Sequence, residues 1–379
     1  MMRRSLSIII SVSLFFLCTG CWDAVSIEAR ASAVALSFDW SEGQYEVGVS
    51  VPIPYKLGSS GVGADSAQPE DGVEDQPRYV NSVQAGSLNE AIDRLSTILQ
   101  RRIYFGQTVI LIFSREVAER GLDPITDYIR RNEEIRIHAR MVVVEGKAIE
   151  FMKNQSQFFN LAMEELRGDL ENGEKIGYAF REKLGKYLMK KNTIAKGVPI
   201  LNMVQYEKDE FMWEGAAVFN RDKMVYKITD PMQTSILNQI RNSLKGFSVR
   251  IPCEKGVIAY LPIGVKSEVQ IDTDRPIPKI IVNVYVDGYV EEKTCPIKLQ
   301  DVKNMRKVSR QIASEYEKGA YDVIQLGKQL GVDLLELQYH MRMNHPELWK
   351  KYQDVKEFQK LPVEIHYDVK VRHYGVNNV

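Results

Sequence analysis

Residues 363–372 alternate apolar and polar side chains more regularly than any other stretch of the chain. One face would hold the apolar side chains of Val363, Ile365, Tyr367, Val369 and Val371, and the other the polar side chains of Glu364, His366, Asp368, Lys370 and Arg372. Period-two alternation predicts a β-strand with one packed and one wet face, which is typical of an antiparallel sheet. We therefore expect the second half of the chain to be α+β, with helices covering one face of a mostly antiparallel sheet.

Apolar periodicity, helix caps and turn residues predict the other elements. In the second half we expect a hairpin at 214–219 and 223–228, a helix from Pro231 ended by Gly246, strands at 257–271 and 279–291, and helices at 301–330 and 334–344. In the first half we expect a hairpin at 33–38 and 45–53, a helix capped by Ser87, a buried strand at 108–113, a helix at 116–131 and a strand at 136–145.

The first residues have the layout of an export signal. Arg3 and Arg4 precede residues 5–18, which carry no charge and are mostly apolar. A run of about fourteen residues suits the apolar region of a signal and is shorter than the ~20 that a membrane-spanning helix needs. The alternatives are a single-pass membrane anchor and a buried N-terminal strand or helix.

Cys21 follows the small residues Thr19 and Gly20, and this stretch resembles the end of a bacterial lipoprotein signal. In such signals the cysteine receives a thioether-linked diacylglycerol and becomes the first residue after cleavage. Cys18 departs from the pattern because it stands where an apolar residue such as leucine is usual. Each buried methylene contributes about 0.8 kcal/mol, so two acyl chains suffice for a stable anchor. We expect the lipid on Cys21.

Changes in composition divide the chain into segments. We predict an α+β, multi-domain fold of about three domains after a cleaved lipoprotein signal, with mixed or antiparallel sheets and helices packed on one side. The segments are a signal at 1–20, an N-terminal α/β lobe at 21–147 with a flexible loop at 58–77, a mostly helical middle region at 148–205 and a C-terminal α+β domain at 206–379. The charge-rich segment KYLMKKN, at 186–192, is interpreted as a solvated helix face, with a basic membrane-touching patch as the alternative.

The chain is electrically balanced, with 50 basic and 50 acidic residues. Proteins that bind nucleic acid usually carry a basic excess, so the composition argues against that class. Once Cys21 carries lipid, Cys253 and Cys295 are the cysteines that remain in the mature chain. They either form a disulfide, as is common in exported proteins, or stay as two separate buried thiols.

The sequence contains none of the common catalytic or cofactor motifs. His340 and His345 are five residues apart, which places them about 140° from each other around a helix and not on one zinc-binding face. The patterns G-x-S-x-G, H-E-x-x-H and G-x-G-x-x-G do not occur. We predict no catalytic, cofactor-binding or metal-binding residue and no enzymatic activity. The alternative is a lipid-anchored hydrolase whose two carboxylates are distant in sequence.

Five segments, taken in order, look like one family. They are GCWD at 20–23, RRIYFGQTVILIFSREVAERGLDPITDYIRRNEEIR at 101–136, WEGAAVFNRDKMV at 213–225, IPC at 251–253 and HPELWKKY at 345–352, with Cys295 and Gly375 also in place. Together they resemble the Ger(x)C family, the C subunits of spore germinant receptors. The match runs over nearly the whole chain, and its specificity lies in the order of the segments.

The resemblance implies a non-enzymatic lipoprotein on the outer face of the spore's inner membrane. It also implies assembly with membrane-spanning A and B receptor subunits in a complex that responds to nutrients. Cys21 is the only functional residue that carries over, and its covalent lipid is the only attached group implied. The alternative function is that of a solute-binding lipoprotein of an import system, which would share the anchor.

Overall fold

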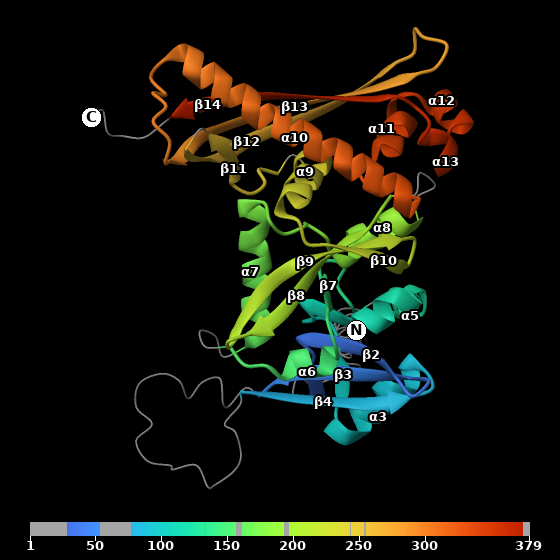
Figure 1. The fold of residues 1–379 in the computed structure, drawn as a ribbon. Helices are drawn as coiled ribbons and strands as arrows, with labels where there is room; N and C mark the ends of the chain where they lie inside the picture. Colours follow the sequence, from blue (N-terminus) through green and yellow to red (C-terminus); the bar gives the residue numbers. More distant parts are fainter. Residues whose placement is uncertain are drawn as a thin grey trace, which may run out of the picture.

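A computed structural model describes residues 29–53, 77–132, 134–156, 161–192, 197–242, 244–253 and 255–373. The predicted signal, Cys21 and all of the predicted 58–77 loop except Pro77 lie outside these residues. The described chain is built on an eight-stranded sheet and a four-stranded sheet, with helices packed between and around them (Figure 1). This arrangement confirms the predicted multi-domain α+β class.

The eight-stranded sheet has the strand order β10-β9-β8-β7-β6-β2-β3-β4. Its strands are β2 (Ala35–Ser41), β3 (Gln44–Pro52), β4 (Arg78–Ala85), β6 (Ile110–Ser114), β7 (Arg140–Val144), β8 (Ile200–Glu207), β9 (Glu210–Asn220) and β10 (Lys223–Ile228). The central strands β2, β6, β7 and β8 pair in parallel, and antiparallel hairpins form both sides. All residues of β6 and β7 are buried, as expected of central parallel strands covered on both faces.

Local sequence signals set several elements of this half. Strands β2 and β3 form the predicted hairpin, and its turn residues Glu42 and Gly43 both have positive φ angles, which suits a two-residue turn between twisted strands. Helix α3 (Leu88–Leu99) begins at Ser87, whose hydroxyl accepts a hydrogen bond from the Glu90 amide. A separate pair of short strands, β1 (Arg30–Ser32) and β5 (Arg102–Tyr104), runs in parallel.

The single helix predicted at 116–131 is wrong, because the chain forms two helices there. Helix α4 (Arg115–Arg120) ends at Gly121, and α5 (Asp123–Arg131) begins two residues later. Gly121 has φ of 123°, and a Cβ atom on it would lie 2.4 Å from a carboxylate oxygen of Asp222. The Leu122 amide donates to the carbonyl of Asp222 at 2.9 Å. Contact with the β9–β10 turn, which is distant in sequence, therefore breaks the helix.

The middle region holds three helices, α6 (Ala148–Lys153), α7 (Ala162–Ile176) and α8 (Leu184–Asn192), followed by β8. The predicted boundary at residue 206 lies inside the β8–β9 hairpin, where Tyr206 pairs with Phe211. Strands β9 and β10 therefore extend the first sheet, although they belong to the predicted C-terminal segment.

The four-stranded sheet has the order β11-β12-β13-β14. Its strands are β11 (Val249–Cys253), β12 (Gly256–Asp272), β13 (Lys279–Lys293) and β14 (Val363–His373). The helices of this half are α9 (Pro231–Asn242), α10 (Val302–Leu330), α11 (Leu337–Asn344), α12 (Pro346–Lys351) and α13 (Val355–Phe358). The long helix α10 matches its prediction, because the Asp301 carboxylate accepts from the Lys303 amide at its start and Gly331 adopts the left-handed conformation at its end.

Three expectations for this half need correction. Strand β14 pairs with β13 in parallel, not antiparallel, with Ile280 opposite Val363 and Asp287 opposite Lys370. The helices α10 to α13 form the crossover that returns the chain to the starting end of β13, as a parallel connection requires. In addition, α9 ends at Asn242 and not at Gly246, and α11 begins at Leu337, three residues later than expected.

One cluster of buried apolar side chains extends from the first sheet to the second. Helix α9 lies between the sheets (Figure 1), and its Ile236, Leu237 and Ile240 belong to this cluster. The cluster also includes Val218 of β9 and Val282 of β13. The two sheets therefore share a core, and their junction is a packed region.

Candidate functional site at the junction of the two sheets

The junction buries several polar side chains beside the shared core. Asn238 of α9 is fully buried and donates to the Gly177 carbonyl at 2.9 Å. Gly177 follows α7 with φ of 102°, and a Cβ atom on it would lie 2.3 Å from the backbone nitrogen of Gly246. The backbones of the two halves therefore approach as closely as glycine alone permits.

Four charged side chains, here called the junction cluster, meet beside α9. They are Glu182 and Lys190 from the first half of the chain, and Arg241 and Glu336 from the second. The Lys190 ammonium lies 3.3 Å from a Glu182 carboxylate oxygen and 3.1 Å from a Glu336 oxygen. The Arg241 guanidinium bonds the same Glu336 oxygen and also donates to the Val198 carbonyl at 2.7 Å. The cluster thus links α8, α9 and the α10–α11 connection.

Two features hold the carboxylates of the α10–α11 connection in place. Glu336 has φ of 57°, a left-handed conformation that is unfavourable for a residue with a side chain. Its bonds to Lys190 and Arg241 keep it in that conformation. Asp333 accepts a hydrogen bond from the Gln338 amide at 2.7 Å and so satisfies a free amide at the start of α11.

Burial and neighbouring charges shift the pKa values of these groups. Burial lowers the pKa of Lys190 to about 8, and the Arg241 charge acts in the same direction. Burial also acts to raise the pKa of Glu336, but Arg241 and Lys190 outweigh it and hold that pKa at about 2. Burial raises the pKa of Asp333 to about 6, despite the amide hydrogen bonds from Gln338 and Leu337. Lys190 and Glu336 therefore form an ion pair at neutral pH.

Asp333 is expected to make the protein less stable as the pH rises from about 4 to about 6. Its folded pKa of about 6 lies above the ordinary aspartate pKa of 3.8, so the neutral carboxyl stabilises the fold below pH 3.8 and this contribution is lost as the pH rises through 6. Asp333→Asn keeps an oxygen acceptor but does not titrate. The stability difference between wild type and Asp333→Asn should therefore change by about 2–3 kcal/mol across this window, in favour of the variant at the higher pH.

Urea unfolding at pH 4, 5.5 and 7 measures this change. Glu336 titrates in a separate window, because its depressed pKa gives stability that is lost only as the pH falls from about 4.5 towards 2. Parallel stability profiles for wild type and Asp333→Asn would contradict the assignment to Asp333.

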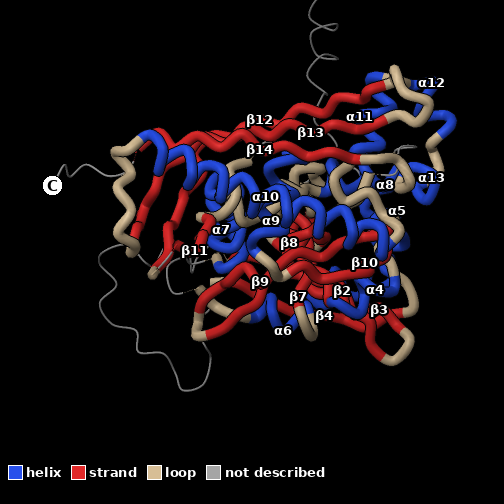
Figure 2. Tube along the Cα trace, turned by 45° about the horizontal axis from the view of Figure 1, so that its top comes forward, coloured by secondary structure: helices blue, strands red, loops and turns tan. Residues whose placement is uncertain are grey.

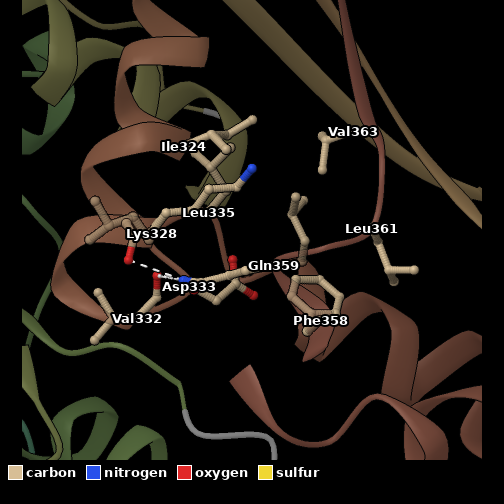
Figure 3. A pocket seen from close by; sticks show the side chains of 12 residues that line it. Ile324, Lys328, Val332, Asp333, Leu335, Phe358, Gln359, Leu361 and Val363 are labelled. Carbon is tan, nitrogen blue, oxygen red and sulfur yellow. Dashed lines mark hydrogen bonds between the residues drawn. The ribbon is translucent and has the colours of Figure 1, made fainter. Parts of the chain in front are cut away.

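Two cavities adjoin Asp333. The larger measures about 970 Å³ and opens between α8, the β9–β10 turn and the α10–α11 connection, with acidic and basic side chains intermixed in its walls. The smaller, shown in Figure 3, measures about 30 Å³, which is room for little more than one water molecule. Its Gln359 amide already donates to the carbonyls of Gly327 and Val332. This cavity is therefore too small to hold a ligand much larger than water.

The two sequence-predicted site residues that the structure describes, Cys253 and Cys295, are not members of the junction cluster. Cys21 is outside the described residues. Cys253 and Cys295 are joined by a disulfide, with their Cα atoms 6.2 Å apart. Within the described ranges no group of three or more His, Cys, Asp or Glu side chains could hold a metal ion. The same residues form no helix that is long and apolar enough to cross a membrane.

Sequence reasoning missed the junction cluster. The segment at 186–192 was expected to be a solvated face, but the Lys190 side chain is only 7% exposed and is bonded to two carboxylates. Its partners come from positions 182, 241 and 336, and no spacing rule connects residues so far apart. The nearest signal is the apolar stripe of α9, which predicts a buried helix without showing what lies against Arg241.

Comparison with known proteins identifies the chain's relatives. Residues 23–206 match the family described as "Spore germination protein N-terminal domain", and residues 214–375 match "Spore germination B3/ GerAC like, C-terminal". The gap between the two matches falls in the β8–β9 hairpin. The chain is 22% identical to "Spore germination protein KC" of Bacillus subtilis (strain 168), over 100% of this chain and 98% of that protein. It is 21% identical to "Spore germination protein GerQC" of Bacillus cereus, over 79% of this chain and 82% of that protein.

A solved structure shares the fold. The "Crystal Structure of the GerBC protein" matches with a TM-score of 0.58 and 14% identity, over 89% of this chain and 97% of that chain. The likeness extends over most of the chain, so the two proteins share the overall fold. With two family matches that together span residues 23 to 375, the chain belongs to the Ger(x)C family of spore germination proteins.

Proposed function

We propose that the protein is a lipid-anchored, non-enzymatic subunit of a nutrient germinant receptor. It would act in spore germination by assembling with membrane-spanning A and B receptor subunits at the outer face of the spore's inner membrane. The observation that carries this proposal is the match over the full chain to a spore germination protein. The solute-binding alternative receives no support from these relatives, because all of them are named for spore germination.

The structure suggests how such a subunit would work. Its charged groups at the junction are bonded to one another and to backbone, which would hold the two sheets in a fixed relation. A lipid on Cys21 would confine this rigid body to the membrane plane and raise its effective concentration near membrane partners. The subunit would then contribute to the receptor by presenting surfaces of fixed shape to its membrane partners.

The anchor is tested by replacing Cys21. In spores of the host, Cys21→Ala should abolish incorporation of labelled palmitate, release the protein from the membrane fraction and impair the response to the nutrient that its receptor senses. Cys18→Ala is the matched control, because this cysteine lies in the part of the signal that would be removed. Label that persists in Cys21→Ala would contradict the lipid site, and a normal response with full membrane attachment would contradict the role of the anchor.

A further inference from the structure

The outer edge of β14 is only partly covered. In a parallel strand, alternate residues direct their backbone N–H and C=O groups toward the same neighbour, and the residues between them point the other way. The amides of Ile365 and Tyr367 point away from β13, because they donate to the Tyr321 hydroxyl at 3.3 Å and to a Glu317 carboxylate oxygen at 3.0 Å. Side chains of α10 therefore cap the first part of this edge.

Val369 is the next residue in the same alternation. Across the described part of the chain, no side chain or loop atom bonds its amide. β14 is the last strand of its sheet and runs beside α10 (Figure 2). An uncapped stretch of strand edge at this position is a ready template for another strand.

A groove follows this uncapped stretch. It measures about 340 Å³ and lies between α10 and β14, lined in part by Met305, Arg306, Ser309, Arg310, Val369 and Lys370. A second hollow of about 450 Å³ borders the same two arginines on their other side, where Lys303 and Lys307 lie. The uncapped strand edge, where Val369 is 6% exposed, and a row of basic side chains thus line adjoining hollows.

The charge of this surface is unusual for the chain. The two hollows are lined by the basic side chains of Lys303, Arg306, Lys307, Arg310 and Lys370, whereas the whole chain is balanced. Asp301 is the acid that precedes Lys303 in the sequence. The Asp301 carboxylate accepts a hydrogen bond from the Lys303 backbone amide at the start of α10. Arg306 and Arg310 are exposed, and no ion pair joins either of them to another described side chain. Asp368 is the single acid among the groove residues.

We propose that this groove docks an extended acidic segment of a partner protein, which adds a strand to β14 and places carboxylates against Arg306 and Arg310. Strand addition supplies backbone hydrogen bonds, and the arginines favour carboxylate partners that they can bind with two parallel bonds. An anionic membrane could bind the basic side chains, but lipid headgroups cannot form a ladder of backbone hydrogen bonds with a strand edge. The two features together therefore favour a protein segment. The inference rests on the proposed function only in taking a receptor subunit as the source of the segment.

The test measures peptide binding to the full chain in detergent by fluorescence anisotropy. The probe is a fluorescein-labelled heptapeptide of alternating glutamate and valine, and the control peptide has lysine in place of glutamate. We expect the acidic peptide to bind and the basic peptide not to bind. Arg306→Glu with Arg310→Glu should weaken binding by about tenfold or more, equivalent to about 1.4 kcal/mol. Lys318→Glu with Lys328→Glu, which makes the same charge change on exposed positions of the same helix, should leave it unchanged.

The strand edge is tested separately with Val369→Pro. Proline removes the outward amide and is tolerated on an edge strand, so binding should weaken, whereas Val369→Ala keeps the amide and should bind normally. If the proline variant fails to fold, the variant with Arg306→Glu and Arg310→Glu still tests whether the groove binds the acidic peptide. Equal binding of both peptides, no binding of the acidic peptide, or an effect of the Lys318 and Lys328 pair equal to that of the arginine pair would overturn the proposal.

Vesicles containing 30% phosphatidylglycerol separate a membrane surface from a protein surface. The proposal would also be overturned if vesicle binding depended on Arg306 and Arg310 while Val369→Pro weakened neither vesicle nor peptide binding. That result would assign the basic surface to lipid headgroups. None of these measurements involves a receptor or a spore. Their failure therefore leaves the germination role intact, while a failure of the Cys21 experiment leaves the groove intact.

Discussion

Replacing Arg241 with leucine is expected to lower the free energy of unfolding by about 3–5 kcal/mol, the usual cost of removing one partner from a buried ion pair. The Arg241 side chain is 1% exposed and bonds both Glu336 and the Val198 carbonyl. Its loss would leave the Glu336 carboxylate buried with Lys190 as its remaining cation. The effect should be large because Arg241 connects α9 to the first sheet and to the α10–α11 connection at once.

Urea unfolding of the purified chain measures this loss. Arg115→Leu is the control, because Arg115 also forms two ion pairs but is 44% exposed, so its replacement should cost no more than about 1 kcal/mol. Glu336→Gln combined with Arg241→Leu should recover part of the loss, since no buried charge would then be left without its main partner. A loss for Arg241→Leu as small as that of the control would show that the junction cluster does not hold the halves together.

Removing the Cys253–Cys295 disulfide should lower the stability by roughly 4 kcal/mol, from the chain entropy of the loop that it closes. The two cysteines are separated by 42 positions, and the loop contains all of β12 and β13. Cys253 ends the edge strand β11, and Cys295 lies at the start of the connection between β13 and α10. The bond therefore fastens an edge strand of the second sheet to the connection that follows β13.

The variant Cys253→Ser with Cys295→Ser, unfolded in urea with and without reductant, measures this contribution. Reductant should destabilise the wild type to about the level of the double variant and should not affect the variant itself. Equal stabilities for oxidised wild type and the double variant would contradict a contribution from the disulfide.

The signals that predicted the fold correctly are local ones. Ser87, Asp301 and Gly331 mark helix ends through bonds to their immediate neighbours, so the chain far away hardly affects them. The alternation in β14 likewise predicts which side chains are buried. It cannot give the direction of pairing, because parallel and antiparallel strands show the same alternation of side chains. The parallel pairing of β14 with β13 follows from the crossover formed by α10 to α13.

Features that depend on distant partners could not be predicted. The break at Gly121 depends on Asp222, and the burial of Lys190 depends on Arg241 and Glu336. A sequence shows the charges of such residues but not the neighbours that neutralise them. The pairing of Cys253 with Cys295 was one of two alternatives that the sequence left open, because these two cysteines remain once Cys21 carries lipid and could equally stay as separate thiols.

Purification from spore inner membranes, with Cys21 intact or replaced by alanine, tests the central claim most directly. We predict that two membrane-spanning receptor subunits, identified by mass, co-purify with the intact protein in a fixed ratio and are largely lost with Cys21→Ala. Recovery of the intact protein without any membrane-spanning subunit, or with the permease and ATPase of an import system, would contradict the assignment to a germinant receptor.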